Sequence, residues 1–311
     1  MSQEVERWAD GAMYPAAPLA KGIEVQLVSA TQDPLGVIAA ASMMYEGKPI
    51  GDLREITDEQ RLHYFEEMGK TKLTAPLEFV DLHFLISGVT RAFTHQMVRQ
   101  RTAVYAQESL RFAVKKNFAR ETPLPPSLAL LKDDDPRRVV WEEHMRETQV
   151  AYEGLIAAGI PAEDARGLLP HQTTTRLHYK TNLRNLVDHV GNRLCTQAQF
   201  EWRRVIFEMM EAMRTYVSAT VDEYSVEIQG GNRHYTGLVH VTKWQWAQII
   251  DPKHGFFVPA CYQAGHCPFK ADFDRGCTIR ERADKGRFDL IEVKEWAADP
   301  TAAYLPTKES K

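Results

Sequence analysis

The chain has 311 residues, of which 44% are hydrophobic and 26% are charged, proportions that are typical of a soluble globular protein. Its net charge of −4 excludes a generally basic surface for duplex nucleic acid, so anion binding would have to come from a local group of arginines. The acidic start is unlike a signal peptide, no apolar run could cross a membrane, and four cysteines are too few for a disulfide scaffold. We therefore expect a cytoplasmic protein.

Hydrophobic periodicity and helix-start signals predict both strands and helices along the chain. The predicted strands cover residues 21–29 and 76–87, and Gly88 is expected to end the second. The predicted helices cover residues 36–47, 57–70, 89–100, 136–159, 161–169 and 185–217. In the last of these, Asn185, His189 and Arg193 lie at four-residue steps beside an apolar stripe, which is typical either of a helix that lines a site or of a solvated face.

The character of the sequence changes after residue 225. Turn residues, a short helical pattern over residues 242–250 and an irregular stretch with cysteine and histidine follow. We therefore predict one domain over residues 1–225 and a C-terminal extension over residues 226–311.

A short segment after the second strand is unusually rich in arginine. Arg99, Arg101 and Arg111 lie within thirteen residues of one another together with Ser109, and a single carboxylate, Glu108, stands against them. Guanidinium groups stay charged and bind phosphate through two parallel hydrogen bonds, and a serine hydroxyl can donate to the same phosphate. Surface ion pairing is the simpler alternative. The sequence has no glycine-rich phosphate loop and no nucleophile elbow.

Arg99-Gln100-Arg101, followed after seven residues by Ser109 and then Arg111, resembles the signature of the flavin-dependent thymidylate synthases. The usual form of that signature is Arg-His-Arg, seven residues, Ser, and a further Arg two residues later. Two later segments, "ARGLLP" at residues 165–170 and "TNLRNLVDHVGNRLCTQAQFEW" at residues 181–202, resemble further segments of the family in order and spacing. The resemblance covers roughly residues 20–220 and leaves residues 225–311 outside it.

The resemblance implies an α+β fold with helices packed on a mixed β-sheet, and a homotetramer whose active sites are shared between subunits. It implies FAD as cofactor, with NADPH and methylenetetrahydrofolate as co-substrates that carry the chemistry without a protein nucleophile. Arg193 would face the pyrimidine and stabilise negative charge at N3, whereas Ser109 and Arg111 would lie near the phosphate. The residues implied for the deoxynucleoside monophosphate are Gln96, Met97, Val98, Arg99, Gln107, Glu108, Ser109, Leu110, Arg111, Arg166 and Arg193. Those implied for FAD are Arg99, Gln100, Arg101, Gln107, Asn182, Leu183, Arg184 and Asp188.

Three positions depart from the family pattern. Gln100 replaces the middle histidine of the signature, Ala106-Gln107 replaces Asn-Glu, and Phe79 stands where a histidine is common. These changes leave dCMP as an alternative substrate, a hydroxymethyl group as an alternative product, and a divergent, phage-like member as our preferred interpretation. The alternative from a different class is a non-catalytic protein that binds nucleotides or single-stranded nucleic acid.

Three cysteines and a histidine lie close together in the C-terminal extension. Cys261, Cys267 and Cys277, with His266, are suitable ligands for a structural zinc ion, although no C-x-x-C pair is present. Three unrelated cytosolic thiols are the alternative.

Overall fold

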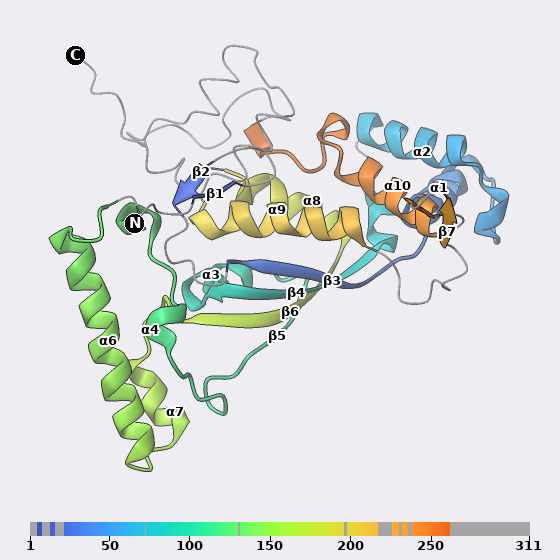
Figure 1. Cartoon of the computed structure of the whole chain (residues 1–311). Coiled ribbons are helices and arrows are strands. Elements are labelled where there is room, and N and C mark those ends of the chain that lie inside the picture. Colours follow the sequence, from blue (N-terminus) through green and yellow to red (C-terminus); the bar gives the residue numbers. More distant parts are fainter. Residues whose placement is uncertain are drawn as a thin grey trace.

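The computed structural model describes residues 5–7, 13–15, 22–71, 73–129, 131–195, 198–216, 226–229, 232–235 and 238–261. A four-stranded sheet in the order β3-β4-β6-β5 lies at its centre (Figure 1). Its strands are β3 (Glu24–Ala30), β4 (Asp81–Thr90), β5 (Val104–Gln107) and β6 (Thr174–Asn182). Each neighbouring pair runs antiparallel. The predicted α+β class is confirmed, but in the described residues the sheet is antiparallel rather than mixed.

One face of this sheet is buried and the other is exposed. Along β6, buried Thr175, Leu177 and Tyr179 alternate with exposed residues, as expected for a strand with one face on the core. Helices α8 (Leu183–Arg193) and α9 (Phe200–Thr215) lie over the buried face (Figure 1). The apolar side chains of α8 and α9 complete the main core with those of the sheet.

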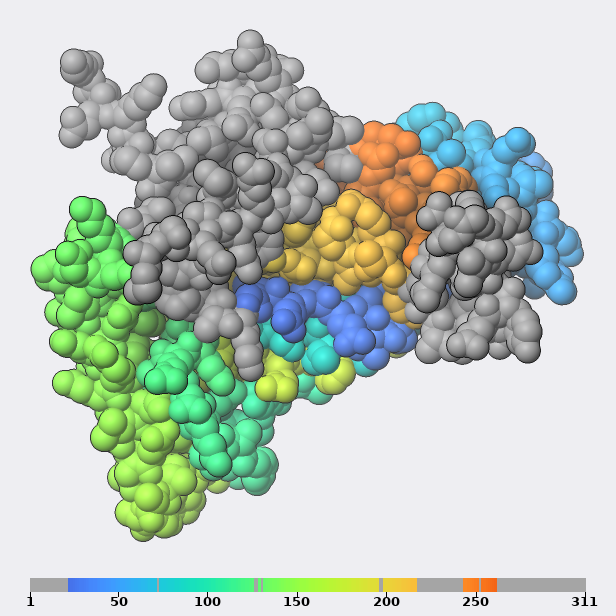
Figure 2. Space-filling model, viewed as in Figure 1, coloured from blue at the N-terminus to red at the C-terminus, as the bar shows by residue number. Residues whose placement is uncertain are grey.

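The other helices gather at the two ends of the sheet. At one end lie α1 (Pro34–Met43), α2 (Asp58–Thr71) and α10 (Leu238–Ile250) (Figure 1). At the other end, α4 (Phe118–Glu121), α6 (Pro136–Ala157) and α7 (Ala162–Ala165) build an arm around a small core of their own (Figure 1). This arm, drawn in green, stands out from the body of the molecule (Figure 2).

Short elements complete the described chain. Two hairpins are formed by β1 (Val5–Arg7) with β2 (Met13–Pro15), and by β7 (Val226–Gln229) with β8 (Asn232–Tyr235). The remaining helical turns are η1 (Met44–Glu46), η2 (Leu53–Glu55), η3 (Ala75–Phe79), α5 (Pro126–Ala129), η4 (Arg166–Leu168) and η6 (Pro252–His254). No helix in the described part of the chain is long and apolar enough to cross a membrane.

Two predicted elements, the central strand and the helix over residues 185–217, differ from those observed. The strand predicted over residues 76–87 begins only at Asp81, because Ala75–Phe79 forms the helical turn η3. The central strand does not end at Gly88, because this glycine adopts a φ of 76° and the strand pairing shifts there, so the strand continues past a bulge to Thr90. The predicted helix over residues 185–217 is two helices, α8 and α9, because the chain leaves the helix after Arg193 and starts again at Phe200.

Residues beyond the predicted boundary at 225 share the main core. Trp246, Ile249 and Phe257 are fully or almost fully buried with the side chains that line the sheet. Gln245 donates from Nε2 to Asp33 Oδ1 at 2.7 Å, which fixes α10 to the start of α1. The division at residue 225 stays a prediction, and these contacts argue against placing residues 238–261 in a separate unit.

Candidate active site

A short helix after the central strand, α3 (Arg91–Met97), connects the parts of the candidate site. Thr90 caps this helix, because its hydroxyl accepts a hydrogen bond from the Phe93 backbone N–H at 3.1 Å. Glu201 in turn accepts bonds from the Thr90 backbone N–H at 2.7 Å and from its hydroxyl at 2.6 Å. Glu201 is only 1% exposed, and burial raises the pKa of its carboxyl group to about 7. The start of α3 is thereby fixed to the first turn of α9.

Three arginines and a serine from separate segments meet beside the start of α3. We call them the arginine cluster: Arg91, Ser109, Arg111 and Arg166. Arg91 Nη1 donates to the carbonyl oxygen of Glu108, directly before Ser109, at 3.2 Å. Arg166 Nε donates to the carbonyl oxygen of Glu163 at 3.0 Å. Burial and then the charge of Arg166 lower the pKa of Arg91, so these two guanidinium groups lie within electrostatic reach of each other.

Arg111 is held by a carboxylate of the arm. Its Nε and Nη2 atoms lie 2.8 and 3.0 Å from the two carboxylate oxygens of Glu163, an ion pair with both groups about half exposed. Ser109 Oγ accepts a hydrogen bond from the Arg111 backbone N–H at 3.3 Å. An anion that binds through the same Nε and Nη2 donors therefore has to replace the carboxylate of Glu163.

The neighbouring predicted residues are engaged inside the protein. The Glu108 carboxylate lies 2.7 Å from Lys115 Nζ, and both side chains are largely buried. Gln107 Nε2 donates to Thr94 Oγ1 at 3.0 Å, and Leu110 is buried. Within this stretch, the exposed residues Ser109 and Arg111 are left to contact a ligand directly.

Arg193, the predicted catalytic residue, lies in a second group, which meets α3 near its end at Gln96. We call it the tryptophan cluster: Gln96, His189, Arg193 and Trp202. Trp202 Nε1 donates to Gln96 Oε1 at 3.1 Å. The His189 ring meets the Trp202 ring edge to face at a centroid distance of 4.8 Å, and the Arg193 guanidinium lies 5.1 Å from the centroid of that same ring.

Two nitrogens of this cluster have no hydrogen-bond partner in the described part of the chain. His189 Nε2 and Arg193 Nε are buried and have no hydrogen-bond partner among the described residues. Burial, reinforced by Arg193, lowers the pKa of His189 to about 4, and burial also lowers the pKa of Arg193. Buried polar groups normally have a partner, so this pair is suited to a polar ligand that lies against Trp202.

Gln100 faces the interior of the protein. Its Oε1 accepts a hydrogen bond from the Tyr179 hydroxyl at 2.8 Å, and its Nε2 donates to the Asn185 carbonyl oxygen at 3.2 Å. The side chain therefore fixes the loop after α3 to the sheet and to the first turn of α8. Both the oxygen and the nitrogen of the amide are therefore hydrogen-bonded inside the protein. The side chains of the two adjacent residues, Arg99 and Arg101, face solvent instead.

Those neighbours, Arg99 and Arg101, are exposed and make no side-chain hydrogen bond or ion pair within the described part of the chain. Arg184 Nε donates to Asp188 Oδ2 at 2.9 Å on the adjacent face of α8. Asn182 caps α8 through its side-chain oxygen. Asn182, Leu183, Arg184 and Asp188 thus lie on or at the start of α8, to which Gln100 is bonded, whereas Gln107 lies farther along the sheet beside Thr94.

Three further predicted residues, Leu183, Met97 and Val98, differ in which of their atoms a ligand could contact. Leu183 and Met97 are fully buried in the main core, so any ligand contact must come from their backbone atoms. Val98 is 45% exposed and can reach a ligand with its side chain.

The predicted zinc ligands fall mostly outside the described residues. This is the case for Cys267, Cys277 and His266. Cys261 is described and packs at the edge of the main core. Within the described ranges no three side chains form a metal-binding group, so zinc stays a prediction for the remaining residues.

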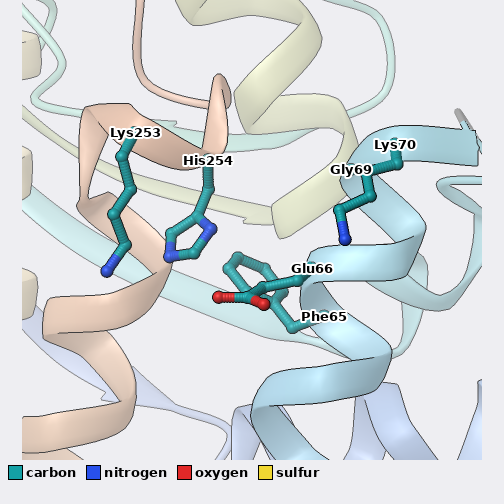
Figure 3. Close-up of a pocket in the computed structure, with 6 residues that line it drawn as sticks. All are labelled: Phe65, Glu66, Gly69, Lys70, Lys253 and His254. Carbon is teal, nitrogen blue, oxygen red and sulfur yellow. The ribbon is translucent and has the colours of Figure 1, made fainter.

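A cavity of about 400 Å³ lies away from all of these groups, between α2 and η6 (Figure 3). The His254 imidazole and the Glu66 carboxylate point toward each other from its two walls (Figure 3). Its lysines already have carboxylate partners, since Lys70 pairs with Glu67 at 2.8 Å and Lys253 with Asp251 at 3.3 Å. It contains none of the predicted site residues, and the site therefore rests on the arginine and tryptophan clusters.

Sequence reasoning did not assign Arg91, Glu163, His189 or Trp202 to the site. Arg91 had a usable signal, because a cation in the first turn of a helix is disfavoured by the helix dipole and so indicates another role. His189 lay in the polar stripe with Arg193. Glu163 had no signal, because its contact with Arg111 joins residues 52 positions apart.

Comparisons with known proteins show the family of this chain. The sequence model of the family described as thymidylate synthase complementing protein matches residues 26–217. A flavin-dependent thymidylate synthase of Pyrococcus furiosus is 31% identical over 267 residues, which cover 84% of this chain and 95% of that protein. One of Geobacter sulfurreducens is 31% identical over 194 residues, covering 62% of this chain and 82% of that protein.

A crystal structure of a UMP/dUMP methylase from Streptomyces cacaoi bound with 5-Br dUMP has a similar fold. Its TM-score is 0.50 at 23% sequence identity, and the match covers 61% of this chain and 89% of that chain. The match with the Pyrococcus protein is too long to fit within residues 1–225, so the family likeness extends past residue 225, where we expected it to end. The family match over more than half of the chain shows that this protein belongs to the flavin-dependent thymidylate synthase family and is an enzyme of that type.

Proposed function

We propose that this chain methylates a pyrimidine deoxynucleoside monophosphate, converting dUMP to dTMP with FAD, NADPH and methylenetetrahydrofolate. The observation that supports this best is that His189 Nε2 and Arg193 Nε, which have no partner among the described residues, belong to side chains that lie against Trp202. Helix α3 joins the two clusters, because Gln96 near its end bonds Trp202 and Arg91 at its start belongs to the arginine cluster. Between Arg91 and Gln96, α3 rises by about 7.5 Å, so one nucleotide could contact both clusters at once.

The two clusters suit the two ends of a nucleotide. The arginine cluster offers a hydroxyl and guanidinium groups, which match a phosphate dianion. In the tryptophan cluster, Arg193 would face the pyrimidine and stabilise negative charge that develops at N3. This interaction gains strength because the guanidinium is half-buried, away from bulk water.

The residues also fit a flavin cofactor. Arg99 and Arg101 are exposed without partners in the described part of the chain, and two guanidinium groups of this kind match the diphosphate of FAD. Asn182, Arg184 and Asp188 would complete the cofactor contacts from α8. When bound, FAD would supply the reducing chemistry and methylenetetrahydrofolate the one-carbon unit.

The arrangement supports a reaction without a protein nucleophile. The Ser109 hydroxyl accepts from the Arg111 backbone N–H, and within the described residues no histidine is hydrogen-bonded to it. The protein's own part is then to bind the phosphate, orient the ring and stabilise its charge. We further propose that the protein is a homotetramer in which different subunits contribute the nucleotide-binding and the flavin-binding residues. Light scattering tests this proposal by measuring the mass of the protein in solution.

The decisive experiment offers dUMP and dCMP separately to the FAD-loaded protein with NADPH and methylenetetrahydrofolate. Mass spectrometry of the nucleotide should show a methyl group added to dUMP. A hydroxymethyl product, or a change in dCMP alone, would select one of the alternative reactions.

The Arg193→Ala variant tests the role of the tryptophan cluster. Loss of a preorganised charge-stabilising group typically lowers kcat by about 10²- to 10³-fold. Arg146→Ala, at an exposed position of α6, is the matched control and should keep full activity. A protein that cannot be loaded with FAD and alters neither nucleotide would favour the non-catalytic alternative.

A further inference from the structure

Arg91, unlike Arg111 and Lys115 close by, has no carboxylate partner among the described residues. Arg111 is paired with Glu163, and Lys115 is paired with Glu108. Arg91 has no ion pair with any described residue. Among these residues its guanidinium makes a single hydrogen bond, to the Glu108 carbonyl oxygen. This bond uses one of its five N–H donors and holds the guanidinium beside Ser109.

A second unpaired cation lies close by. Arg166 likewise has no ion pair within the described ranges, and its side-chain hydrogen bond goes to the carbonyl oxygen of Glu163. Arg91 is also half-buried, which makes the repulsion between the two charges stronger than it would be in water. The Glu108 carboxylate attracts the Arg91 charge and offsets part of this repulsion, but it is already paired with Lys115. An anion that lies between the two guanidinium groups stabilises both charges.

We infer that Arg91 is a phosphate-binding residue that clamps the 5′-phosphate of the nucleotide together with Arg166 and the Ser109 hydroxyl. This inference rests on the proposed function and assigns the phosphate a ligand outside the arginine signature. A phosphate dianion suits the place better than a single carboxylate, because two guanidinium groups and a hydroxyl match its charge and its several acceptor oxygens. Arg111 would join only after releasing Glu163.

The experiment measures how much the phosphate adds to binding. Calorimetric titration of the FAD-loaded protein with dUMP and with deoxyuridine gives the ratio of the two affinities. In Arg91→Gln this ratio should fall by about 10- to 100-fold, as expected for the loss of a charged hydrogen-bonding partner. The affinity for deoxyuridine should stay unchanged, which a merely structural defect would not allow.

Two further variants make the result specific. Arg91→Lys keeps the charge without the planar fork and should keep part of the phosphate preference. Arg146→Gln, exposed on α6, should keep all of it. Full preference retained in folded Arg91→Gln and Arg91→Lys would overturn the inference while leaving the proposed function intact. A wild-type protein that binds neither compound would overturn the proposed function and this inference with it.

Discussion

Glu201 is a carboxyl group that the fold keeps almost entirely away from water. It receives hydrogen bonds from the backbone and hydroxyl of Thr90 and from Gln199 Nε2. Burial nevertheless outweighs these bonds, and the pKa is raised to about 7. The group that fixes α3, and with it both clusters of the site, therefore changes charge near neutral pH.

The raised pKa of Glu201 predicts a pH-dependent stability. The ordinary pKa of a glutamate is 4.5, so between pH 4.5 and about 7 the folded protein binds a proton that the unfolded chain has released. The free energy of unfolding should therefore fall as pH rises through this window, by about 1.4 kcal/mol for each unit of pKa difference. Denaturant unfolding at pH 5 and pH 8 measures this fall, which should be smaller in Glu201→Gln.

Comparing the two proteins removes the effect of other groups. His189 acts in the opposite direction, because its pKa is lowered to about 4, and the unfolded chain binds the extra proton between pH 4 and 6.5. That contribution is the same in the wild type and the variant. Stability curves that remain parallel between pH 5 and pH 8 would show that Glu201 does not titrate in this range.

Site residues that follow a fixed spacing along the chain could be predicted from the sequence. Site residues that are identified only by their neighbours in space could not. Arg99, Ser109 and Arg111 follow a pattern along the chain, and the structure places Ser109 and Arg111 with Arg166. Nothing in the spacing shows that Gln100 points inward, because its partners are Tyr179 and the carbonyl oxygen of a residue 85 positions away.

Among the elements, α7 has a direct contact with the site. Glu163 is in this four-residue helix of the arm, and its carboxylate forms an ion pair with the guanidinium of Arg111. The same residue offers its carbonyl oxygen to Arg166. The arm therefore holds two of the three arginines of the cluster before a nucleotide binds.

Glu163→Gln should strengthen nucleotide binding. The variant removes a carboxylate that competes with the phosphate for Arg111. An ion pair with about half of each side chain exposed contributes about 0.2–1 kcal/mol, so the affinity for dUMP should rise by about 1.4- to 5-fold. Calorimetric titration measures the change, and Glu147→Gln, an exposed position on α6, serves as control. Weaker binding in Glu163→Gln would mean that the carboxylate positions Arg111 for the phosphate instead of competing with it.

Elements were predictable where the pattern is local. The long helix of the arm starts and ends within two residues of the predicted range of 136–159. No strand is predicted from the sequence at β6, although Thr175, Leu177, Tyr179 and Thr181 alternate with polar residues. Two of these four inward-facing residues are threonines, so the hydrophobic alternation is weak. The break between α8 and α9 has no such signal, since apolar residues continue on both sides of it.

At the scale of the whole molecule, the core joins segments that are far apart in sequence. Trp246, Ile249 and Phe257 pack with residues of the sheet and of α2, and Gln245 reaches Asp33 across 212 positions. A change of composition after residue 225 therefore does not separate what the core brings together. Composition reports local character, whereas the extent of a core depends on long-range contacts that a single sequence does not display.

This shared core predicts how the chain responds to truncation. Ending the chain at residue 225 removes five buried apolar side chains of the main core, namely Trp246, Ile249, Ile250, Phe256 and Phe257. Each is worth about 1.5–3 kcal/mol, and their sum is comparable with the whole stability of an average domain, about 5–15 kcal/mol. A protein of residues 1–225 should therefore show no cooperative thermal unfolding by circular dichroism, whereas residues 1–261 should unfold cooperatively.

Point variants separate loss of the core from loss of chain length. Trp246→Ala should cost about 3–5 kcal/mol in the full chain, because the fully buried ring leaves a cavity. Trp244→Ala, on the same helix but only partly buried, should cost less. If residues 1–225 instead unfold cooperatively at the temperature of the full chain, the boundary predicted from composition is correct. In that case α10 covers a domain that is already complete without it.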